Sequence, residues 1–154
     1  LYQMALKGKQ QEVSKAVPAV ITILEDPKLA KNAAIQSKGC AIFWALAFDS
    51  PAQGKDLGKK VIPLILKILK NFSSDATVQQ QGYGALGNLA VNNEANKQLM
   101  VSGAPTIWKT VVLLGTKGGA TVTAGKDADR KPAGKAPDPA TSAVVSGLAL
   151  LKML

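Results

Sequence analysis

The 154 residues, of which 47% are hydrophobic, suffice for one domain with a substantial core. There is no histidine, which removes the commonest metal ligand and general base, and the single cysteine, Cys40, excludes an internal disulfide. The net charge of +9 favours anionic partners, but Arg130 is the only arginine and aromatic content is 5%, so base recognition in nucleic acid is disfavoured.

The first predicted elements form a cycle of helices. Residues 1–7 have the pattern of a helix end whose beginning is absent, and the sequence has no initial methionine, so we expect a fragment of a longer protein. A short polar helix is predicted at 10–16. A second helix follows at 17–24, because Pro18 suits the first helical turn, where its missing N–H costs no bond. A long third helix is predicted at 29–48.

The same cycle recurs in the next part of the chain. A short helix at 54–60 and an apolar helix at 61–71 precede a long helix that ends at Ala90. The candidates for the N-cap of this long helix are Ser73, Ser74 and Asp75.

A third cycle begins after the long helix. A short helix is predicted at 94–101 and a second helix at 104–114. Pro18, Pro63 and Pro105 open equivalent second helices. The recurring unit is therefore a short, a medium and a long helix.

The third cycle is interrupted at 115–139. This segment is rich in glycine, alanine, proline and charge and has no large apolar residue after Val122, so we expect an exposed, mobile insertion. The last helix, at 140–154, is rich in leucine. Because an array normally ends on a polar helix, we expect further repeats or self-association at this C-terminal helix.

Two segments of the sequence match each other. Residues 35–47 match 78–90 at an offset of 43 residues, a period typical of stacked helical repeats. The offset pairs Gln36 with Gln79, Gly39 with Gly82, Leu46 with Leu89 and Ala47 with Ala90. We therefore predict one domain over 1–154. Its parts are the end of a preceding repeat at 1–7 and repeats at 9–49, 51–91 and 94–154.

The three-helix unit resembles an armadillo repeat. The resemblance is strongest over 78–114, where the long helix ends in Ala-Leu-Gly-Asn-Leu-Ala at 85–90. Glu-Ala-Asn-Lys at 94–97 and Gly103 at the bend continue the family pattern. HEAT repeats are the near alternative, but they use two helices per unit. The resemblance implies an all-α, right-handed α-solenoid of about three repeats, truncated at both ends.

Armadillo arrays bind extended protein segments along a concave groove lined by their third helices. The family holds the bound backbone with an asparagine amide, and Asn88 matches that residue. Its counterparts are Ala45 and approximately Leu150, which lack the amide. The residues that the resemblance assigns to the groove are Asn88, Gln81, Gly84, Lys38, Ala41, Ala45 and Ser146.

Tryptophans separate this chain from one class of armadillo proteins. Import receptors carry a tryptophan one turn before the asparagine, where this chain has Gly84, Ala41 and about Ser146. The resemblance therefore does not extend to an adaptor for basic import signals. Trp44 and Trp108 lie in apolar helices, and we predict that both pack in the core.

No catalytic motif is found in the sequence. Residues 119–126, Gly-Ala-Thr-Val-Thr-Ala-Gly-Lys, resemble a phosphate-binding loop, but have one residue too many, and Asp127 replaces the required Ser or Thr. We predict no enzymatic activity, no cofactor and no metal. The buried setting expected for Cys40 predicts an unreactive thiol.

We therefore predict a non-enzymatic scaffold or adaptor that binds an extended peptide or a helical segment of a protein partner. One alternative is a basic surface for nucleic acid or acidic lipid, for which the lysine candidates are Lys59, Lys60, Lys67 and Lys70. Another is a structural arm of a larger multi-subunit assembly. The apolar run at 61–69 contains Lys67 and is too short to span a bilayer. We expect the cytoplasm as compartment, with the nucleus as the alternative.

Overall fold

The computed structural model describes residues 10–48, 51–117 and 138–154. Within these ranges every regular element is a helix and none is a strand, so the all-α prediction is confirmed. The helices are α2 (Gln10–Ser14), α3 (Val17–Glu25), α4 (Ala33–Phe48), α5 (Pro51–Asn71), α6 (Ala76–Ala90), α7 (Glu94–Val101), α8 (Ala104–Lys117) and α9 (Pro139–Met153). The predicted helix end at 1–7 and most of the predicted insertion lie outside the described residues.

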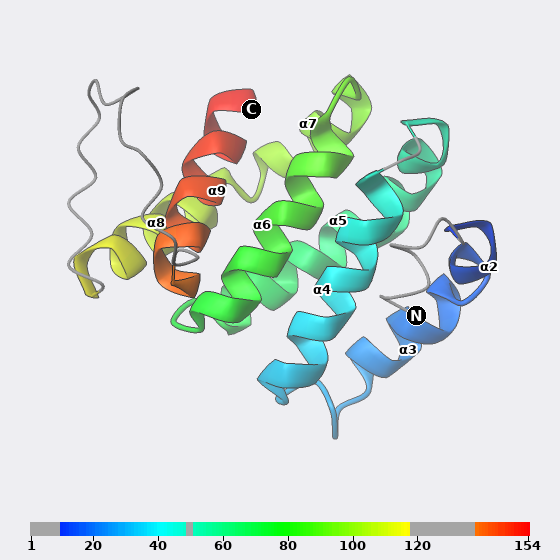
Figure 1. The fold of residues 1–154 in the computed structure, drawn as a ribbon, viewed down its shortest axis with the longest axis horizontal. Helices are drawn as coiled ribbons and strands as arrows, with labels where there is room; N and C mark the ends of the chain where they lie inside the picture. Colours follow the sequence, from blue (N-terminus) through cyan, green and yellow to red (C-terminus); the bar gives the residue numbers. More distant parts are fainter. Residues whose placement is uncertain (1–9, 49–50, 118–137) are drawn as a thin grey trace.

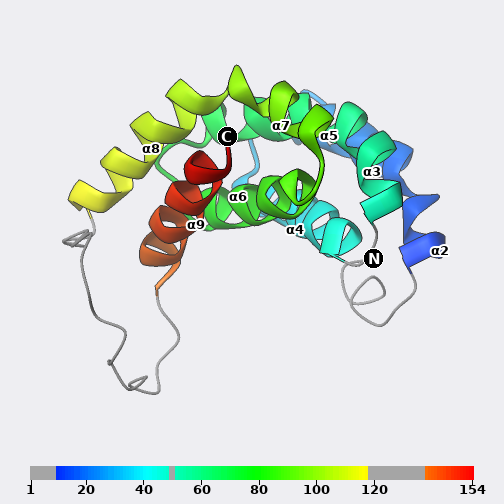
Figure 2. The ribbon, with the colours of Figure 1, turned by 90° about the horizontal axis from the view of Figure 1, so that it is seen from above.

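The helices form two curved rows. The inner row contains α4, α6 and α9, and α6 packs between the other two (Figure 1). The outer row contains α3, α5 and α8, and Figure 2 shows it on the convex side of the arch. Contacts between the rows join α3 to α4, α5 to α6 and α8 to α9. We call these the first, second and third helix pairs.

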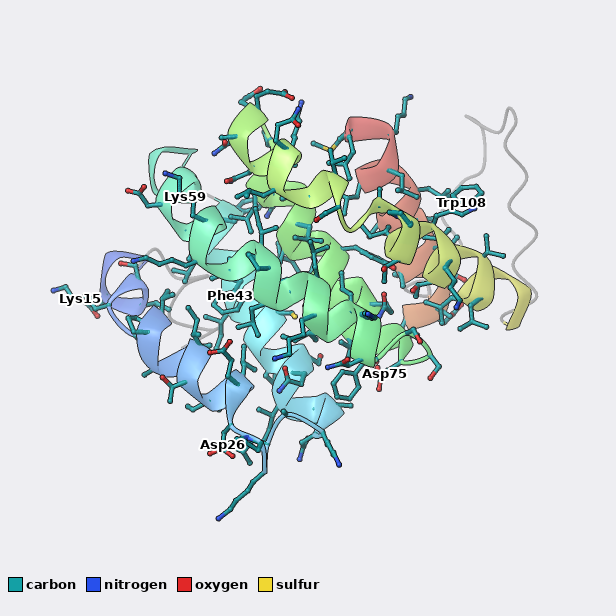
Figure 3. All side chains as sticks on the ribbon, turned by 180° about the vertical axis from the view of Figure 1, so that it is seen from behind. Lys15, Asp26, Phe43, Lys59, Asp75 and Trp108 are labelled. Atoms are coloured by element: carbon teal, nitrogen blue, oxygen red, sulfur yellow. The ribbon has the colours of Figure 1, made fainter. Side chains whose placement is uncertain are left out.

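The core lies between the two rows. Phe43 of α4 is fully buried near the middle of the molecule, whereas Lys15, Asp26 and Lys59 lie at its periphery (Figure 3). Other fully buried side chains come from both rows, namely Leu46, Ile62, Ile65, Leu69, Leu86, Leu89 and Ile107. Burial of each such side chain contributes roughly 2 kcal/mol. One continuous apolar layer thus holds the rows together.

Short polar side chains set the starts of several helices. Of the three predicted caps for α6, the structure selects Asp75, whose Oδ1 accepts a hydrogen bond of 2.9 Å from the N–H of Val78. Asn93 caps α7 through a bond from the N–H of Asn96, at 3.1 Å. Each cap satisfies a backbone donor that has no partner within its helix. The structure also confirms the predicted start of α7 at Glu94 and the predicted end of α6 at Ala90.

The start of α4 differs from the prediction. The helix begins at Ala33 instead of residue 29. Asp26 accepts a bond of 2.7 Å from the N–H of Lys28, which holds the chain in a turn. Asn32 then accepts a bond of 3.2 Å from the N–H of Ile35 and acts as the cap. Local side-chain bonds therefore delay the helix.

The largest correction concerns α5. Two helices were predicted at 54–60 and 61–71, with Pro63 opening the second, but the structure has a single helix with Pro63 inside it. The buried positions of α5 form one stripe at helical spacing across the predicted break: Gly58, Val61, Ile62, Leu64, Ile65, Ile68 and Leu69. Pro63 is exposed, so water can bond the carbonyl that its missing N–H leaves without a helical partner. Burial of the stripe therefore outweighs the proline signal.

Candidate protein-binding surface

The predicted groove residues all come from the inner row. Helix α4 carries Lys38, Ala41 and Ala45. Helix α6 carries Gln81, Gly84 and Asn88, and α9 carries Ser146. Spacings of three and four residues place the members of each set on one side of their helix. We call the solvent-facing sides of α4, α6 and α9 the inner surface; it is the concave side of the arch (Figure 2).

The predicted residues are not equally accessible. Lys38 is exposed, and Gln81, Gly84, Asn88 and Ser146 are half-buried. Ala41 and Ala45 are each only 5% exposed, against the expectation that they offer contact area. Their short side chains do not rise above the neighbouring side chains. The inner surface therefore has small residues at its floor and polar groups beside them.

Trp44 and Gly84 form a specific contact between α4 and α6. A Cβ atom added to Gly84 would lie 2.9 Å from Cδ2 of the Trp44 indole. Because that separation is too short for a real side chain, Gly84 provides the space that the indole occupies. Trp44 is half-buried and packs against the core. Gly84 is therefore a packing position more than a ligand contact.

Asn88 is engaged with the neighbouring inner helix. Its Nδ2 donates a hydrogen bond to the backbone carbonyl of Trp44, at a long distance of 3.4 Å. A side-chain amide has two N–H donors and an acceptor oxygen, so this one long bond leaves capacity for a peptide group. Asn88 therefore joins α4 to α6 and also presents an amide at the surface.

Gln81 has a buried amide oxygen, a feature that it shares with the core residues Gln36 and Gln79. It is half-buried, yet its Oε1 is buried without a hydrogen-bond partner among the described residues. A buried acceptor without a partner costs about 1–3 kcal/mol. Rotation of the amide toward solvent, or a donor from a ligand, would remove that cost. Of the predicted residues, Gln81 therefore has the clearest need for an N–H donor.

Two buried glutamines connect the inner helix to the outer helix in the first two helix pairs. Nε2 of Gln36 donates to the carbonyl of Leu24 at 3.0 Å, and Nε2 of Gln79 donates to the carbonyl of Leu69 at 2.7 Å. Each glutamine thus bonds the end of the outer helix of its own pair. Sequence reasoning paired these glutamines through the 43-residue offset but assigned them no role.

The segment Glu-Ala-Asn-Lys at 94–97, which resembles the armadillo pattern, also has a structural role. Asn96 is fully buried, and its Nδ2 donates to the carbonyl of Leu89 at 2.8 Å, which ties α7 to the end of α6. A Cβ atom on Gly58 would collide with the Asn96 amide, so α5 approaches α7 closely at this point. Lys97 and Glu94 form an ion pair of 3.6 Å at the surface.

The third pair has a different register from the one predicted. Cβ atoms added to Gly39, Gly82 and Gly147 would collide with Leu24, Leu69 and Val111 respectively, which makes the three glycines equivalent. Gly82 and Gly147 are 65 residues apart, and the buried positions of α6 and α9 follow the same offset. The counterpart of Asn88 is therefore Met153. Leu150, the predicted counterpart, is 1% exposed and belongs to the core.

The structure also adds two surface residues that sequence reasoning missed. Phe48 at the end of α4 is 73% exposed, and Val91 after α6 is 49% exposed. They are equivalent under the 43-residue offset, and each lies one turn beyond Ala45 or Asn88. The signal for them was present in the sequence, since the same offset that selected Ala45 and Asn88 also reaches these two apolar residues.

Charge on the inner row has one sign. The helices α4, α6 and α9 contain no aspartate or glutamate, and their only charged residues are Lys38 and Lys152. Both lysines are exposed. The side chains of the inner row therefore favour a neutral or acidic ligand over a basic one.

Two further predictions about single residues have different outcomes. Cys40 is fully buried, and burial raises the pKa of its thiol to about 12, so the predicted unreactive setting is confirmed. Trp108 is 57% exposed, so the prediction that it packs in the core is wrong. It projects from α8 at the edge of the molecule (Figure 3). Among the described residues, no outer helix follows α8 in the row.

Comparisons with protein-family models, with curated proteins and with solved structures found no match. The resemblance to armadillo repeats therefore depends on the residues of the chain itself. None of the described helices is both long and apolar enough to cross a membrane.

Proposed function

We propose that the chain is an array of armadillo-type repeats that binds an extended protein segment along the inner surface. Equivalent contacts support the array: Gln36 and Gln79 make the same bonds, and three glycines receive side chains of the preceding outer helices. The second pair departs from the three-helix pattern, because α5 merges the short and the medium helix. The first and third pairs keep a separate short helix, α2 or α7.

The inner surface has the chemistry for a peptide backbone. The amide of Asn88 offers a donor and an acceptor, as a neighbouring strand would, and Gln81 holds a buried acceptor that needs a donor. The small residues of the floor allow a backbone to approach. Phe48 and Val91 would contact apolar side chains of the bound segment, and Lys38 would favour acidic ones.

The observation that carries this proposal is the unsatisfied acceptor of Gln81, on the same side of α6 as the Asn88 amide and about two turns before it. It predicts that a display library of random peptides, selected on the purified chain, yields extended binders with acidic and apolar residues. Asn88→Ala should weaken the binding of the selected peptides about tenfold, because this change in affinity corresponds to the loss of one or two hydrogen bonds. Circular dichroism should show an unchanged helical fold.

Asn71→Ala is the matched control, because Asn71 is exposed at the end of α5 in the outer row. It should leave peptide affinity unchanged, as measured by fluorescence anisotropy. An equal affinity of Asn88→Ala and the parent chain would rule out the proposed role of the inner surface.

A basic outer surface is the second candidate. Because α5 is one continuous helix, Lys59, Lys67 and Lys70 lie along one exposed side of it. A ligand bound through several phosphates would lose affinity steeply as salt increases, whereas the inner-surface peptide would not. A lysine-to-glutamine triple variant should abolish such binding and leave the selected peptides unaffected.

A further inference from the structure

Two neighbouring contacts of the inner row differ at the inner surface. Helix α6 packs against α4 on one side and against α9 on the other (Figure 1). Where α4 meets α6, the Trp44 indole lies over Gly84, and a Cβ atom added to this glycine would come within 2.9, 3.0 and 3.1 Å of three indole carbons. The contact of α6 with α9 has a different residue at the position of the tryptophan.

The residue of α6 at the tryptophan position is Gly87. The 43-residue offset between α4 and α6 pairs Trp44 with Gly87. The 65-residue offset between α6 and α9 pairs Gly84 with Ala149. The counterpart of the contact between Trp44 and Gly84 is therefore the place between Gly87 and Ala149, which we call the open site.

Two observations show that the described side chains leave the open site unfilled. A Cβ atom added to Gly87 would meet nothing within 4 Å beyond the adjoining backbone of its own helix. Ala149 is exposed, whereas its counterpart Gly84 is half-buried under the indole. The open site lies between two described helices of the array, so it does not depend on what precedes or follows them.

Packing within the described part of the chain does not account for Gly87. Gly82 and Gly84 of the same helix each make room for a neighbouring side chain, from Leu69 and Trp44 respectively. Gly87 makes room for none, although a glycine inside a helix lowers stability relative to alanine. The missing side chain leaves a surface that a ligand can approach closely.

We infer that the open site receives an aromatic side chain of the bound protein segment, as Gly84 receives Trp44. The flat ring of an aromatic residue offers a large apolar area that packs closely on a surface without side chains. Lys152 is exposed about one turn after Ala149, and it favours an acidic residue beside the aromatic one. The inference rests on the proposed function, because it names the anchor of the segment that the inner surface would bind.

The first test uses the peptides selected by display on the purified chain. We expect the binders to share a tryptophan, phenylalanine or tyrosine. Its replacement by alanine should weaken binding at least about tenfold in fluorescence anisotropy, and leucine should recover only part of that loss. Binders that Asn88→Ala weakens, but whose affinity does not depend on an aromatic residue, would overturn this inference and leave the proposed function intact.

Gly87→Trp is the variant that fills the open site. It supplies its own indole, so an aromatic peptide and its alanine version should bind this variant with the same, reduced affinity. Its denaturation midpoint should be no lower than that of the parent chain, because nothing described collides with the new side chain. Asn71→Trp adds the same residue in the outer row and should keep the parent's preference for the aromatic peptide. The inference is wrong if Gly87→Trp keeps that preference as well.

A probe without a peptide group separates this inference from the proposed function. Free indole, titrated into the isotope-labelled chain and followed by nuclear magnetic resonance, should shift the amide signals of Gly87 and Ala149 and not that of Asn71. Gly87→Trp should remove the shift of Ala149. If display yields no binders, the proposed function fails and this titration decides whether the open site takes an aromatic ring. Unshifted Gly87 and Ala149 signals in the parent chain would then overturn the inference.

Discussion

The first two helix pairs and the third pair solve the same packing problem with different residues. In the first two, a fully buried glutamine of the inner helix bonds backbone carbonyls at the end of the outer helix. In the third, the equivalent residue is Val144, which is 3% exposed. The close approach at the neighbouring glycine is common to all three pairs. The helix contact is therefore retained while the polar group is not.

The connection between the two helices explains the difference. In the second pair α5 ends at Asn71 and α6 begins at Ala76, and Gln79 also bonds the carbonyl of Phe72 in this tight turn, at 2.9 Å. In the third pair α8 ends at Lys117 and α9 begins only at Pro139. A buried glutamine is useful where a short turn directs carbonyls toward it, as Leu29 and Phe72 show in the first two pairs.

The largest effect should come from adding the glutamine to the third pair. Val144→Gln would bury an amide at a site that packs an apolar side chain, and it would also add volume. The two costs together are roughly 3 kcal/mol. Chemical denaturation followed by circular dichroism measures the loss. Val144→Leu adds volume without polar atoms and should lose clearly less; equal losses would show that size alone matters.

Removal of the glutamine from the second pair should have the next largest effect. Gln79→Met keeps the side-chain length and leaves the carbonyls of Leu69 and Phe72 without their side-chain donor. The expected loss is about 2 kcal/mol in the free energy of unfolding. Gln80→Met, at the half-buried neighbouring position, should change stability little. If both variants are equally stable, Gln79 does not lock the pair.

The same change in the first pair should cost less. Gln36 bonds the carbonyls of Leu24 and Leu29 at 3.0 and 3.5 Å, longer than the corresponding bonds of Gln79 at 2.7 and 2.9 Å. Gln36→Met should therefore lower the free energy of unfolding by about 1 kcal/mol. The measurement is the denaturation midpoint, compared directly with Gln79→Met. A larger loss for Gln36→Met would contradict the ranking that the bond lengths give.

Sequence reasoning predicted best where the chain repeats itself with short connections. The 43-residue offset aligned α4 with α6 and paired Gln36 with Gln79, and the structure gives the two glutamines the same bonds. The offset could not be carried into the third pair, because the longer connection leaves the register unconstrained. There only the burial pattern and the contact of Gly147 with Val111 fix it.

Other features depended on contacts between distant residues. The proline signal at Pro63 was misleading because the buried stripe of α5 continues on both sides of this exposed residue. The bond from Asn88 to the Trp44 carbonyl and the fit of the indole over Gly84 join two helices, and neither can be read from one segment. Trp108 was predicted as core from its apolar helix, but burial there requires a neighbour that only another element can supply.

The smallest expected effect concerns how the third pair starts its inner helix. Asp138 caps α9 by accepting bonds from the N–H groups of Ala140 and Thr141, at 2.9 and 3.1 Å. The Thr141 hydroxyl also donates to its Oδ2, at 2.7 Å. These bonds hold the pKa of Asp138 below its ordinary value, and the bond from the Thr141 hydroxyl has the largest effect.

A lowered pKa in the folded state means that the charged cap stabilises the fold above the ordinary aspartate pKa. The stabilisation is lost as pH falls through the lowered folded pKa. Thermal melts should therefore show that Thr141→Ala lowers the melting temperature at neutral pH and that the difference shrinks in acid. Ser142→Ala, at the next position, should show no such pH dependence. Because Asp138 is exposed, the shift should be the smallest of the four, and a difference that persists unchanged in acid would mean that Thr141 acts through packing instead of the charged cap.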